Sequence, residues 1–397
     1  MRSAAIVGVG HTRFGHLSYL SMAEVAWQAI RLALQDAGIT QRDVGFVVAS
    51  NVGGWSSEPL PAIVVNDYSG LNPAGSVRVE AACASGSAAI RTAYHSVVSG
   101  YTDIALVVGV EKMTESPNLQ GVELLGRAGN YFWEFEQFGL TFPAYYALYA
   151  TAYMSQYGAR EEDLAAVAVK NHYYGSLNPL AHFQKKITPE DVMSSRYVAW
   201  PLKLYDCSPI TDGAAAVVIA SEKVAIRLTD TPVWIRGMGV ATDTANLSRR
   251  PHFLGLASAV KASEEAYRRS GIDRDGVAKK LDLVQVHDCF TIAEIIAYED
   301  LGIARRGEGF NMVREGETYK GGLIPVNLDG GLKAKGHPIG ATGVSMAVEV
   351  AKQLRQQAEK TRQADIVNGV GLAHNVGGTG HYAYVTVYSL DKPPAIS

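Results

Sequence analysis

The stretch GGLKAKGHPIGATG, residues 330–343, places a single histidine, His337, among five glycines and directly before Pro338. Glycine has no side chain and adopts backbone conformations that other residues avoid, so such a loop can bring its backbone close to a bound group. We interpret the stretch as a loop that presents His337 to a ligand with little obstruction. Two other segments indicate which chemistry this histidine serves.

The first segment is VEAACASGSAAI, residues 79–90, which contains Cys83 just before a helical run that begins near Ser85. A cysteine at the start of a helix lies near free N–H groups and the positive end of the helix dipole, and both favour the thiolate. The thiolate is the nucleophilic form of cysteine. Cys83 is therefore a candidate nucleophile, although most lone cysteines are small buried apolar residues.

The second segment is VQVHDCFTIAEI, residues 284–295, in which His287 and Cys289 stand two residues apart at the end of an expected strand. Residues two apart on a strand point to the same side. Zinc is one use of such a pair, but we find no second Cys or His pair at zinc-ligand spacing and expect no metal. We interpret His287 and Cys289 as a proton-transfer pair. The alternative is a buried histidine bonded to backbone.

Two further observations concern His337 and the segment GLAHNVGGTG, residues 371–380. A histidine beside a thiol can accept its proton, so we expect His337 to act on Cys83. His374 and Asn375 follow an expected strand at 364–370 and precede glycines, which predicts a turn whose N–H groups stabilise an oxyanion. The alternative is a structural turn with Asn375 in a left-handed conformation.

The composition is that of a globular protein, with 47% apolar residues, 19% charged residues and a formal net charge of −3 over 397 residues. We expect no nucleic-acid partner from this charge and no membrane span, because no apolar run is long enough. The N-terminus has no signal-peptide pattern and the C-terminus has no peroxisomal address. Three cysteines argue against a disulfide framework, so we expect a reducing, cytoplasmic location.

Strand-like runs alternate with amphipathic helical runs along the chain, which predicts a layered α/β architecture. The two halves follow the same order of elements, so an internal duplication is plausible. Expected helices lie at Met22–Ala37, Ser85–Val98, Ala257–Ser270 and 345–357, and expected strands at 4–9, 44–50, 104–110, 233–240, 283–287, 364–370 and 382–388.

A different stretch lies between the halves, at about residues 115–200. Eleven of the 35 aromatic residues of the chain fall within residues 131–157. Aromatic residues dominate protein cores and interfaces, so packing of an inserted subdomain or a subunit contact is the plainer interpretation. The sharper interpretation is an apolar wall for a bulky or aromatic acyl group. The two interpretations are compatible.

Taken together, these segments resemble the thiolase superfamily along the whole chain. The segment around Cys83 resembles the nucleophile segment, DCSPITDGAAAVVIAS at residues 206–221 resembles the segment that closes the first half, and GGLKAKGHPIGATG is similar to the G-H-P-x-G-x-(T/S)-G signature. Ordinary thiolases carry N-E-A-F where this chain has His287–Phe290, and a second catalytic Cys where it has His374. The variant H-D-C-F with a later H-N resembles sterol carrier protein-type thiolases and their bacterial and archaeal acetyl-CoA acetyltransferase-like relatives.

The resemblance implies an α/β thiolase fold of two duplicated βαβ-type halves in a five-layer αβαβα sandwich with an inserted loop domain. The implied domains are residues 1–114, completed by about 201–225, a loop domain at 115–200 over the active site, and 226–397. It also implies at least a homodimer, or a dimer of dimers, and a possible small zinc-ribbon and OB-fold partner subunit.

The same resemblance implies roles for individual residues. Cys83 is acylated, His337 accepts its proton, and His287 with His337 forms the first oxyanion hole. Cys289 moves the proton on the α-carbon. The N–H groups of Cys83 and of the turn at Val376 form the second oxyanion hole, supported by the neighbouring His374, Asn375 and Gly377. Ser208 matches a position near the pantetheine of coenzyme A, which is a cosubstrate; no permanently bound cofactor is expected.

The implied reaction is cleavage or formation of a 3-oxoacyl-CoA by Claisen chemistry, with CoA as acyl acceptor. We favour a bulky or aromatic substrate, such as an arylsuccinyl-type 3-oxoacyl-CoA in β-oxidation, because of the aromatic cluster. The alternatives are an acetoacetyl-CoA thiolase, an acyl-CoA retro-aldolase and a thiolase-like scaffold subunit without catalysis. Retro-aldolases of this type dispense with the nucleophilic cysteine, so the presence of Cys83, Cys289 and His337 argues against that activity.

Overall fold

The computed structural model describes residues 3–393 and contains one nine-stranded sheet in the order β3-β2-β4-β7-β1-β8-β11-β10-β9. The first five positions come from the first part of the chain and the last four from its second part. The strands are β1 (Ala4–His11), β2 (Phe46–Ser50), β3 (Gly75–Val79), β4 (Ile104–Lys112), β7 (Asp212–Ser221), β8 (Val233–Thr242), β9 (Leu283–Gln285), β10 (Val370–Gly377) and β11 (Tyr382–Ser389). A separate hairpin pairs β5 (Tyr197–Ala199) with β6 (Leu202–Lys203).

The two parts of this sheet have the same topology. In the first, β7 is antiparallel to β1 and β4, and β4 is parallel to β2. In the second, β11 is antiparallel to β8 and β10, and β10 is parallel to β9. The second part has a parallel bridge between Val284 of β9 and Val326, which is equivalent to the parallel pairing of β2 with β3 in the first part. The predicted duplication is therefore confirmed. Only two residue pairs of β1 and β8 join the two parts.

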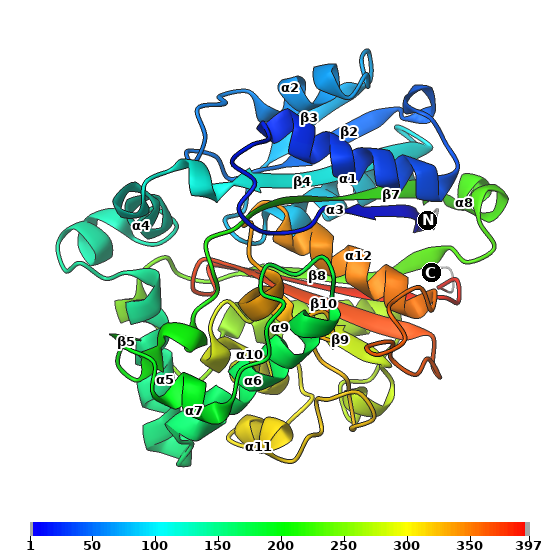
Figure 1. Ribbon diagram of the computed structural model, residues 1–397. Coiled ribbons are helices and arrows are strands. Elements are labelled where there is room, and N and C mark those ends of the chain that lie inside the picture. The colour runs from blue at the N-terminus through cyan, green and yellow to red at the C-terminus, as the bar shows by residue number, and fades with distance from the viewer. Residues whose placement is uncertain (1–2, 394–397) are drawn as a thin grey trace.

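Helices form three layers around the two parts of the sheet (Figure 1). Helix α1 covers the outer face of the first part, α3 and α12 lie between the two parts, and α9 and α10 cover the second part. This is the predicted five-layer αβαβα sandwich. The helices of the three layers are α1 (Met22–Ala37), α3 (Ser85–Val98), α9 (Ala257–Ser270), α10 (Thr291–Asp300) and α12 (Thr342–Leu354). Three shorter helices are α2 (Pro61–Tyr68), α8 (Glu222–Leu228) and α11 (Gly309–Arg314).

Glycines set the distance between layers at equivalent places. A Cβ on Gly10 of β1 would collide with the carbonyl of Ala29 in α1, and a Cβ on Gly239 of β8 would collide with the carbonyl of Ala262 in α9. The two central helices also approach closely where they begin, because a Cβ on Gly86 of α3 would lie 2.6 Å from the backbone nitrogen of Val344 in α12. The starts of α3 and α12 are therefore brought together at one point in the molecule.

The sequence predicted three helices, α1, α3 and α9, with their observed bounds, and local signals mark the ends of α1 and α9. Helix α1 begins at a capping box formed by Ser21 and Glu24 and ends at Gly38, whose φ of 65° is left-handed. Helix α9 ends in the same way at Gly271, with a φ of 66°. Side-chain caps and left-handed glycines are local stop and start signals, which is why sequence alone locates these ends.

The expected strand at residues 364–370 is wrong, because β10 begins only at Val370. The Asp282 carboxylate accepts hydrogen bonds from the N–H groups of Asn368, Gly369 and Val370, and these contacts hold the segment in a turn. As a consequence, His374 and Asn375 lie inside β10 and not in the turn that we expected after a strand. The expected helix at 345–357 is also displaced, since α12 spans Thr342–Leu354.

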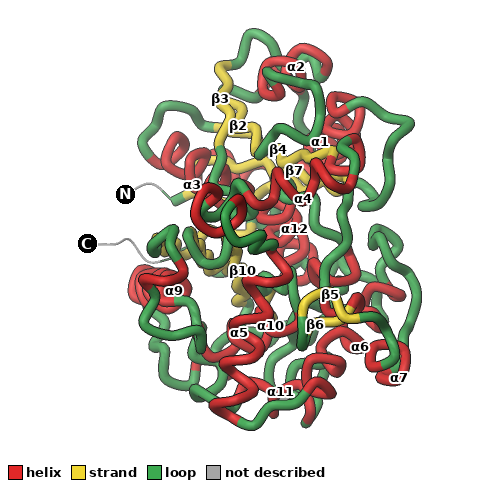
Figure 2. Tube along the Cα trace, turned by 90° about the vertical axis from the view of Figure 1, so that its left-hand side faces the viewer, coloured by secondary structure: helices red, strands yellow, loops and turns green. Residues whose placement is uncertain are grey.

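Residues 115–200 are mostly helical; α5, α6 and α7 lie beside the second half, whereas α4 lies toward the first half (Figure 2). Helices α5 and α6 pack against α10, and α6 also packs against the π-helical turn Gly331–Lys335 in the glycine-rich loop. The domain boundaries stated above remain predictions. The helices of the segment are α4 (Asn118–Gly126), the π-helical turn η3 (Tyr131–Glu136), α5 (Phe142–Tyr157), α6 (Glu161–Leu177) and α7 (Pro189–Met193).

The aromatic cluster divides into two groups. Four tyrosines of α5 are fully buried in the main core, whereas Phe132, Trp133 and Phe138 are exposed. The buried group supports the packing interpretation. Within residues 3–393, no helix combines the length and the hydropathy that crossing a bilayer requires. The buried tyrosines are Tyr145, Tyr146, Tyr149 and Tyr153.

Candidate active site

Cys83, His287 and His337 converge in the interior, with one donor atom of each within 4.8 Å of the others. All three are buried, and the two imidazole rings lie 5.1 Å apart, nearly perpendicular. Cys83 lies in the turn between β3 and α3, His287 follows β9, and His337 precedes α12. The site therefore sits where the two central helices begin, with residues from both halves.

Two backbone N–H groups face the Cys83 thiol, those of Gly378 and of Cys83 itself. Burial raises the pKa of the Cys83 thiol to about 12, and these two donors oppose the shift. The resting group is consequently a neutral thiol that needs a base. Apolar side chains of Trp55, Met113 and Ile339 pack around it. A water-excluded thiol flanked by two fixed N–H donors is suited to acyl transfer, since the donors stabilise charge that develops nearby.

The position of the proton on His337 follows from its neighbours. Nδ1 lies 2.6 Å from the Thr342 hydroxyl, and that hydroxyl donates to the Pro338 carbonyl at 3.0 Å. Since a hydroxyl has one proton, Nδ1–H must be the donor to Thr342, which leaves Nε2 with its lone pair. Burial, with a smaller effect of Lys335, lowers the pKa of His337 to about 3. His337 is thus a neutral imidazole with a free acceptor, as a base for Cys83 requires.

His287 has the opposite arrangement because Asn375 contacts it. The Asn375 amide donates from Nδ2 to the Cys83 carbonyl at 3.0 Å and to His287 Nδ1 at 3.1 Å, and its Oδ1 accepts from the Ser87 hydroxyl at 2.9 Å. A carbonyl can only accept, so the amide orientation is fixed and His287 Nδ1 is an acceptor. His287 therefore carries its proton on Nε2 as a donor. Burial, with His337 and His374, lowers its pKa.

Cys289 lies in the same buried region, and burial followed by the proximity of Cys83 raises its pKa. The Tyr146 hydroxyl hydrogen-bonds to the Cys289 thiol, and its ring stacks on Phe290 at 4.7 Å. Tyr146 belongs to the aromatic cluster, but no local pattern in the sequence distinguishes it from the other tyrosines there. The backbone N–H of Ser208 donates to the Cys289 carbonyl at 3.0 Å, so Ser208 adjoins this part of the site.

The remaining predicted residues lie in β10, with a different arrangement from the one expected. Val376 pairs with Ala383 of β11, and the peptide N–H that reaches the Cys83 thiol belongs to Gly378. The expected oxyanion donor at Val376 stays a prediction, but β10 extends to Gly377, so the turn starts later in the chain than expected. Within residues 3–393, neither ring nitrogen of the buried His374 has a hydrogen-bond partner, and burial lowers its pKa to about 4.

Two buried carboxylates hold the glycine-rich loop. Glu111 of β4 accepts from the N–H groups of Val52, Gly53 and Gly340, and burial raises its pKa to about 7. Asp288 accepts from the N–H groups of Leu332 and Lys333. The loop is therefore fixed on both sides of His337. Neither carboxylate was singled out from the sequence, because their partners are distant in the chain.

The three converging donors are also of the types that bind zinc, namely one thiol and two imidazoles. His337 has a free Nε2 lone pair for a ligand, whereas His287 carries its proton on Nε2 because its Nδ1 accepts from Asn375. The thiol, however, would have to ionise against a raised pKa. The absence of a bound metal stays a prediction from the sequence.

Comparisons with known proteins agree with this geometry. Residues 4–223 match the family model described as "Thiolase, N-terminal domain", and residues 239–390 match "Thiolase C-terminal domain-like". The chain belongs to the thiolase family. It is 42% identical over 391 residues to an acetyl-CoA acetyltransferase of Methanothermobacter thermautotrophicus, covering 98% of this chain and 100% of the relative.

Two further relatives show which members of the thiolase family the chain is similar to. The chain is 33% identical to the benzoylsuccinyl-CoA thiolase subunit BbsB of Thauera aromatica, over 95% of both chains. It is also 33% identical to sterol carrier protein 2 of Gallus gallus, covering 100% of this chain and 73% of that protein, which confirms the predicted subtype. The solved structure "Ltp2-ChsH2(DUF35) aldolase" aligns with a TM-score of 0.85 at 26% identity over 98% of both chains. The protein is thus an acyltransferase of the thiolase family.

Proposed function

We propose that the protein cleaves or forms a 3-oxoacyl-CoA through an acyl-enzyme on Cys83, with CoA as the acyl acceptor. The observation that carries the proposal is the convergence of the Cys83 thiol with His287 and His337 in a buried site. The two imidazoles differ in the location of their protons, and this difference supplies one base and one donor. Such a division of roles is what Claisen chemistry beside a thioester needs.

In the cleavage direction, His337 Nε2 takes the proton of the Cys83 thiol, and the thiolate attacks the 3-oxo carbon of the substrate. The oxygen of the resulting tetrahedral intermediate accepts from the N–H groups of Cys83 and Gly378. When the C2–C3 bond breaks, the acyl group stays on sulfur and the electron pair leaves as the enolate of the departing CoA thioester, which is acetyl-CoA when C2 carries no substituent. Its oxygen accepts from Nε2–H of His287 and of protonated His337, which stabilises the developing charge.

The enolate carbon then takes a proton, which we assign to the Cys289 thiol. The raised pKa of Cys289 is consistent with a group that gives its proton only to a strong base such as an enolate carbon. Loss of this CoA thioester leaves room for CoA, whose thiol loses its proton to Cys289 and attacks the acyl-enzyme. As the acyl group moves to CoA, Cys83 leaves as a thiolate and takes its proton back from His337, which completes the cycle. The same steps in reverse give condensation.

The finer assignment of substrate is an acyl group larger than acetyl, as in an arylsuccinyl-type 3-oxoacyl-CoA. The similarity to a benzoylsuccinyl-CoA thiolase subunit supports it, and the higher identity to acetyl-CoA acetyltransferases supports acetoacetyl-CoA as the second candidate. The aromatic cluster supports the larger acyl group less than we expected, because four of its tyrosines pack in the core. Participation in β-oxidation and a cytoplasmic location remain predictions.

The test is thiolysis of a 3-oxoacyl-CoA by the Cys83→Ser variant. We expect a loss of at least about 10³-fold in kcat and no acyl-enzyme mass in intact-protein mass spectrometry, because the hydroxyl is a far weaker nucleophile in a neutral site. Undiminished thiolysis would overturn the proposal. A different result would favour a retro-aldolase, the activity for which the similar structure is named. That result is cleavage of a 3-hydroxyacyl-CoA in the absence of CoA by both the wild type and the variant.

We also propose a small partner subunit in addition to a homodimer. A similar structure is titled as a complex with a DUF35 protein, and one relative is named as a subunit. Size-exclusion chromatography after co-expression with the product of a neighbouring gene tests this assembly. Co-elution is expected, and independent elution of the two proteins would contradict it.

A further inference from the structure

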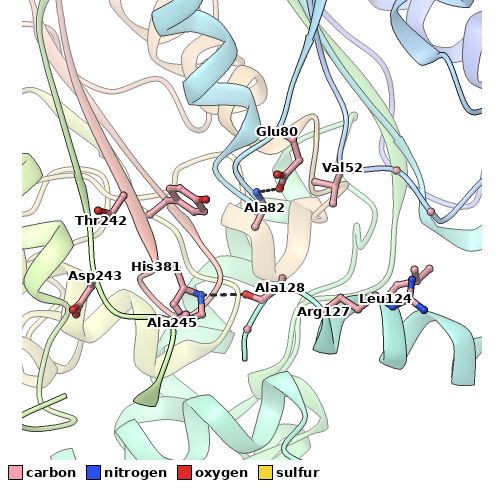
Figure 3. Close-up of a pocket in the computed structure, with 14 residues that line it drawn as sticks. Val52, Glu80, Ala82, Leu124, Arg127, Ala128, Thr242, Asp243, Ala245 and His381 are labelled. Carbon is pink, nitrogen blue, oxygen red and sulfur yellow. Dashed lines mark hydrogen bonds between the residues drawn. The ribbon is translucent and has the colours of Figure 1, made fainter. Parts of the chain in front are cut away.

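A cavity of about 620 Å³ is lined in part by Ala82, the residue that precedes the nucleophile (Figure 3). Its walls come from the turn before α3, from α4 and the residues after it, and from the adjoining ends of β8 and β11. Ligand cavities for small molecules occupy about 300–1,000 Å³, so the cavity is large enough for a substantial ligand. An acetyl group would fill only a small part of it.

The cavity shares apolar side chains with the cluster around Cys83. Ala82, which lines the cavity, directly precedes Cys83 in the chain. Val52 and Leu124 also line the cavity, and both pack in the small apolar cluster that contains Cys83 and Trp55. Movement of a side chain such as Leu124 would connect the thiol to the cavity.

The cavity lies apart from the acid–base side of the site. None of its lining residues belongs to the segment His287–Phe290, to the glycine-rich loop 330–343, or to the segment around Ser208. These three segments face the part of the substrate that carries the thioester of CoA in the mechanism above. The cavity therefore adjoins the other side of the nucleophile, where the remainder of the acyl group extends from the 3-oxo carbon.

The lining combines apolar groups beside the Cys83 cluster with three charged side chains, Glu80, Arg127 and Asp243, which already have partners. Leu124 and Val52 are apolar. His381 is held by a contact between its Nδ1 and the Ala128 carbonyl at 3.1 Å, and burial, followed by Arg250, lowers its pKa, so the imidazole is neutral. Arg127 is the cationic lining residue, and it already forms an ion pair with Glu123 at 2.6 Å.

We propose that this cavity binds the acyl chain beyond C3 of the 3-oxoacyl-CoA, and that it accepts an aryl or longer apolar chain. The inference rests on the proposed thiolase function and deepens it. On attack by Cys83, C3 becomes bonded to sulfur, and the chain extends past Leu124 into the cavity. Leu124 and the cavity walls then determine which acyl groups the enzyme transfers.

The test compares two substrates, acetoacetyl-CoA and 3-oxo-3-phenylpropanoyl-CoA, in thiolysis by variants that fill the cavity. Thr242 is exposed at the end of β8 and lines the cavity, so Thr242→Trp adds bulk without disturbing the core. We expect kcat/KM for the phenyl substrate to fall at least tenfold and that for acetoacetyl-CoA to change less than twofold. Ala128→Phe fills the cavity from the opposite wall and should give the same pattern.

A matched control is Leu119→Trp, which adds bulk on the same helix as Leu124 at a side chain that is 87% exposed and away from the cavity. It should leave both substrates unaffected. The cavity assignment is overturned if both filling variants change the two substrates equally, or if neither variant changes either. It is also overturned if the wild type cleaves acetoacetyl-CoA and not the phenyl substrate, a result that leaves the thiolase function intact. Failure of both substrates in the wild type would instead count against the proposed function.

Discussion

Strands β4 and β10 occupy equivalent places in the two halves, and each holds the reactive turn of the other half. Glu111, near the end of β4, accepts from the N–H of Gly340 in the His337 loop, which belongs to the second half. Asn375, near the end of β10, donates to the carbonyl of Cys83, which belongs to the first half. The duplicated fold thus makes each half a support for the chemistry of the other.

The difference between the two side chains follows from what each must contact. Glu111 faces N–H donors only, and a carboxylate offers acceptors only, so the match is complete. Asn375 faces a carbonyl and an imidazole nitrogen on one side and a hydroxyl on the other, which requires both a donor and an acceptor. Duplication has therefore preserved the place of the support while the contacts determine its chemical type.

The largest effect on kcat is expected when His337, the base in the loop that Glu111 holds, is replaced. His337→Phe should lower kcat for thiolysis by about 10²–10⁴-fold, the range for loss of a general acid–base group. Thr342→Val is the matched control: it retains the imidazole and removes the acceptor for Nδ1 together with the hydroxyl's contact to the Pro338 carbonyl, so a smaller loss is expected. Steady-state kinetics with one 3-oxoacyl-CoA substrate measures both.

The pH dependence of the wild type sharpens this prediction. The pKa of His337 is about 3 and that of Cys83 about 12, so both groups are neutral between these limits. Protonation of His337 removes the base only as pH falls toward 3, and ionisation of Cys83 sets in only as pH rises toward 12. We therefore expect kcat/KM to be flat from about pH 5 to 9. A single ionisation near pH 6.5, lost in the His337 variant, would contradict the neutral pair.

A smaller effect is expected when the donor of Asn375 is replaced by an acceptor. Asn375→Asp has nearly the same shape, but its carboxylate can only accept, so His287 would move its proton to Nδ1 and lose the donor at Nε2. We expect kcat to fall by about 10²-fold, comparable to removal of one oxyanion-hole donor. Ser87→Ala, which removes only the contact to Oδ1, is the control and should cost much less. Equal losses in the two variants would show that Asn375 acts only through packing.

The smallest effect on kcat, and the clearest effect on the free energy of unfolding, is expected when Glu111, the residue of the first half that is equivalent to Asn375, is replaced. Glu111→Gln replaces one acceptor by an NH₂ group facing N–H donors, and an unsatisfied buried group costs about 1–3 kcal/mol. Urea unfolding should record a free energy of unfolding lower by this amount, and kcat should change less than in Asn375→Asp. A stability equal to that of the wild type would indicate that the carboxylate is protonated in the folded protein and is replaced without loss.

Much of this arrangement was accessible from the sequence. The segments that contain Cys83, His287, Cys289 and His337 were identified, and the structure brings Cys83, His287 and His337 together. Their roles in catalysis remain to be tested by the variants above. The strand at 364–370 was not predicted correctly, because Asp282, distant in the sequence, holds that segment in a turn. The same misplaced strand put the expected turn at Val376, whereas β10 extends to Gly377.

The sequence by itself determined the helices whose ends carry local signals, such as α1 with its capping box and left-handed glycine. It also determined the reactive residue types, because a thiol and imidazoles set among small residues stand out in any context. Tertiary structure alone decided which nitrogen of each histidine carries the proton and which peptide N–H faces Cys83. Those properties depend on contacts such as that between Asn375 and the Cys83 carbonyl, 292 residues apart, and no local pattern encodes such a pairing.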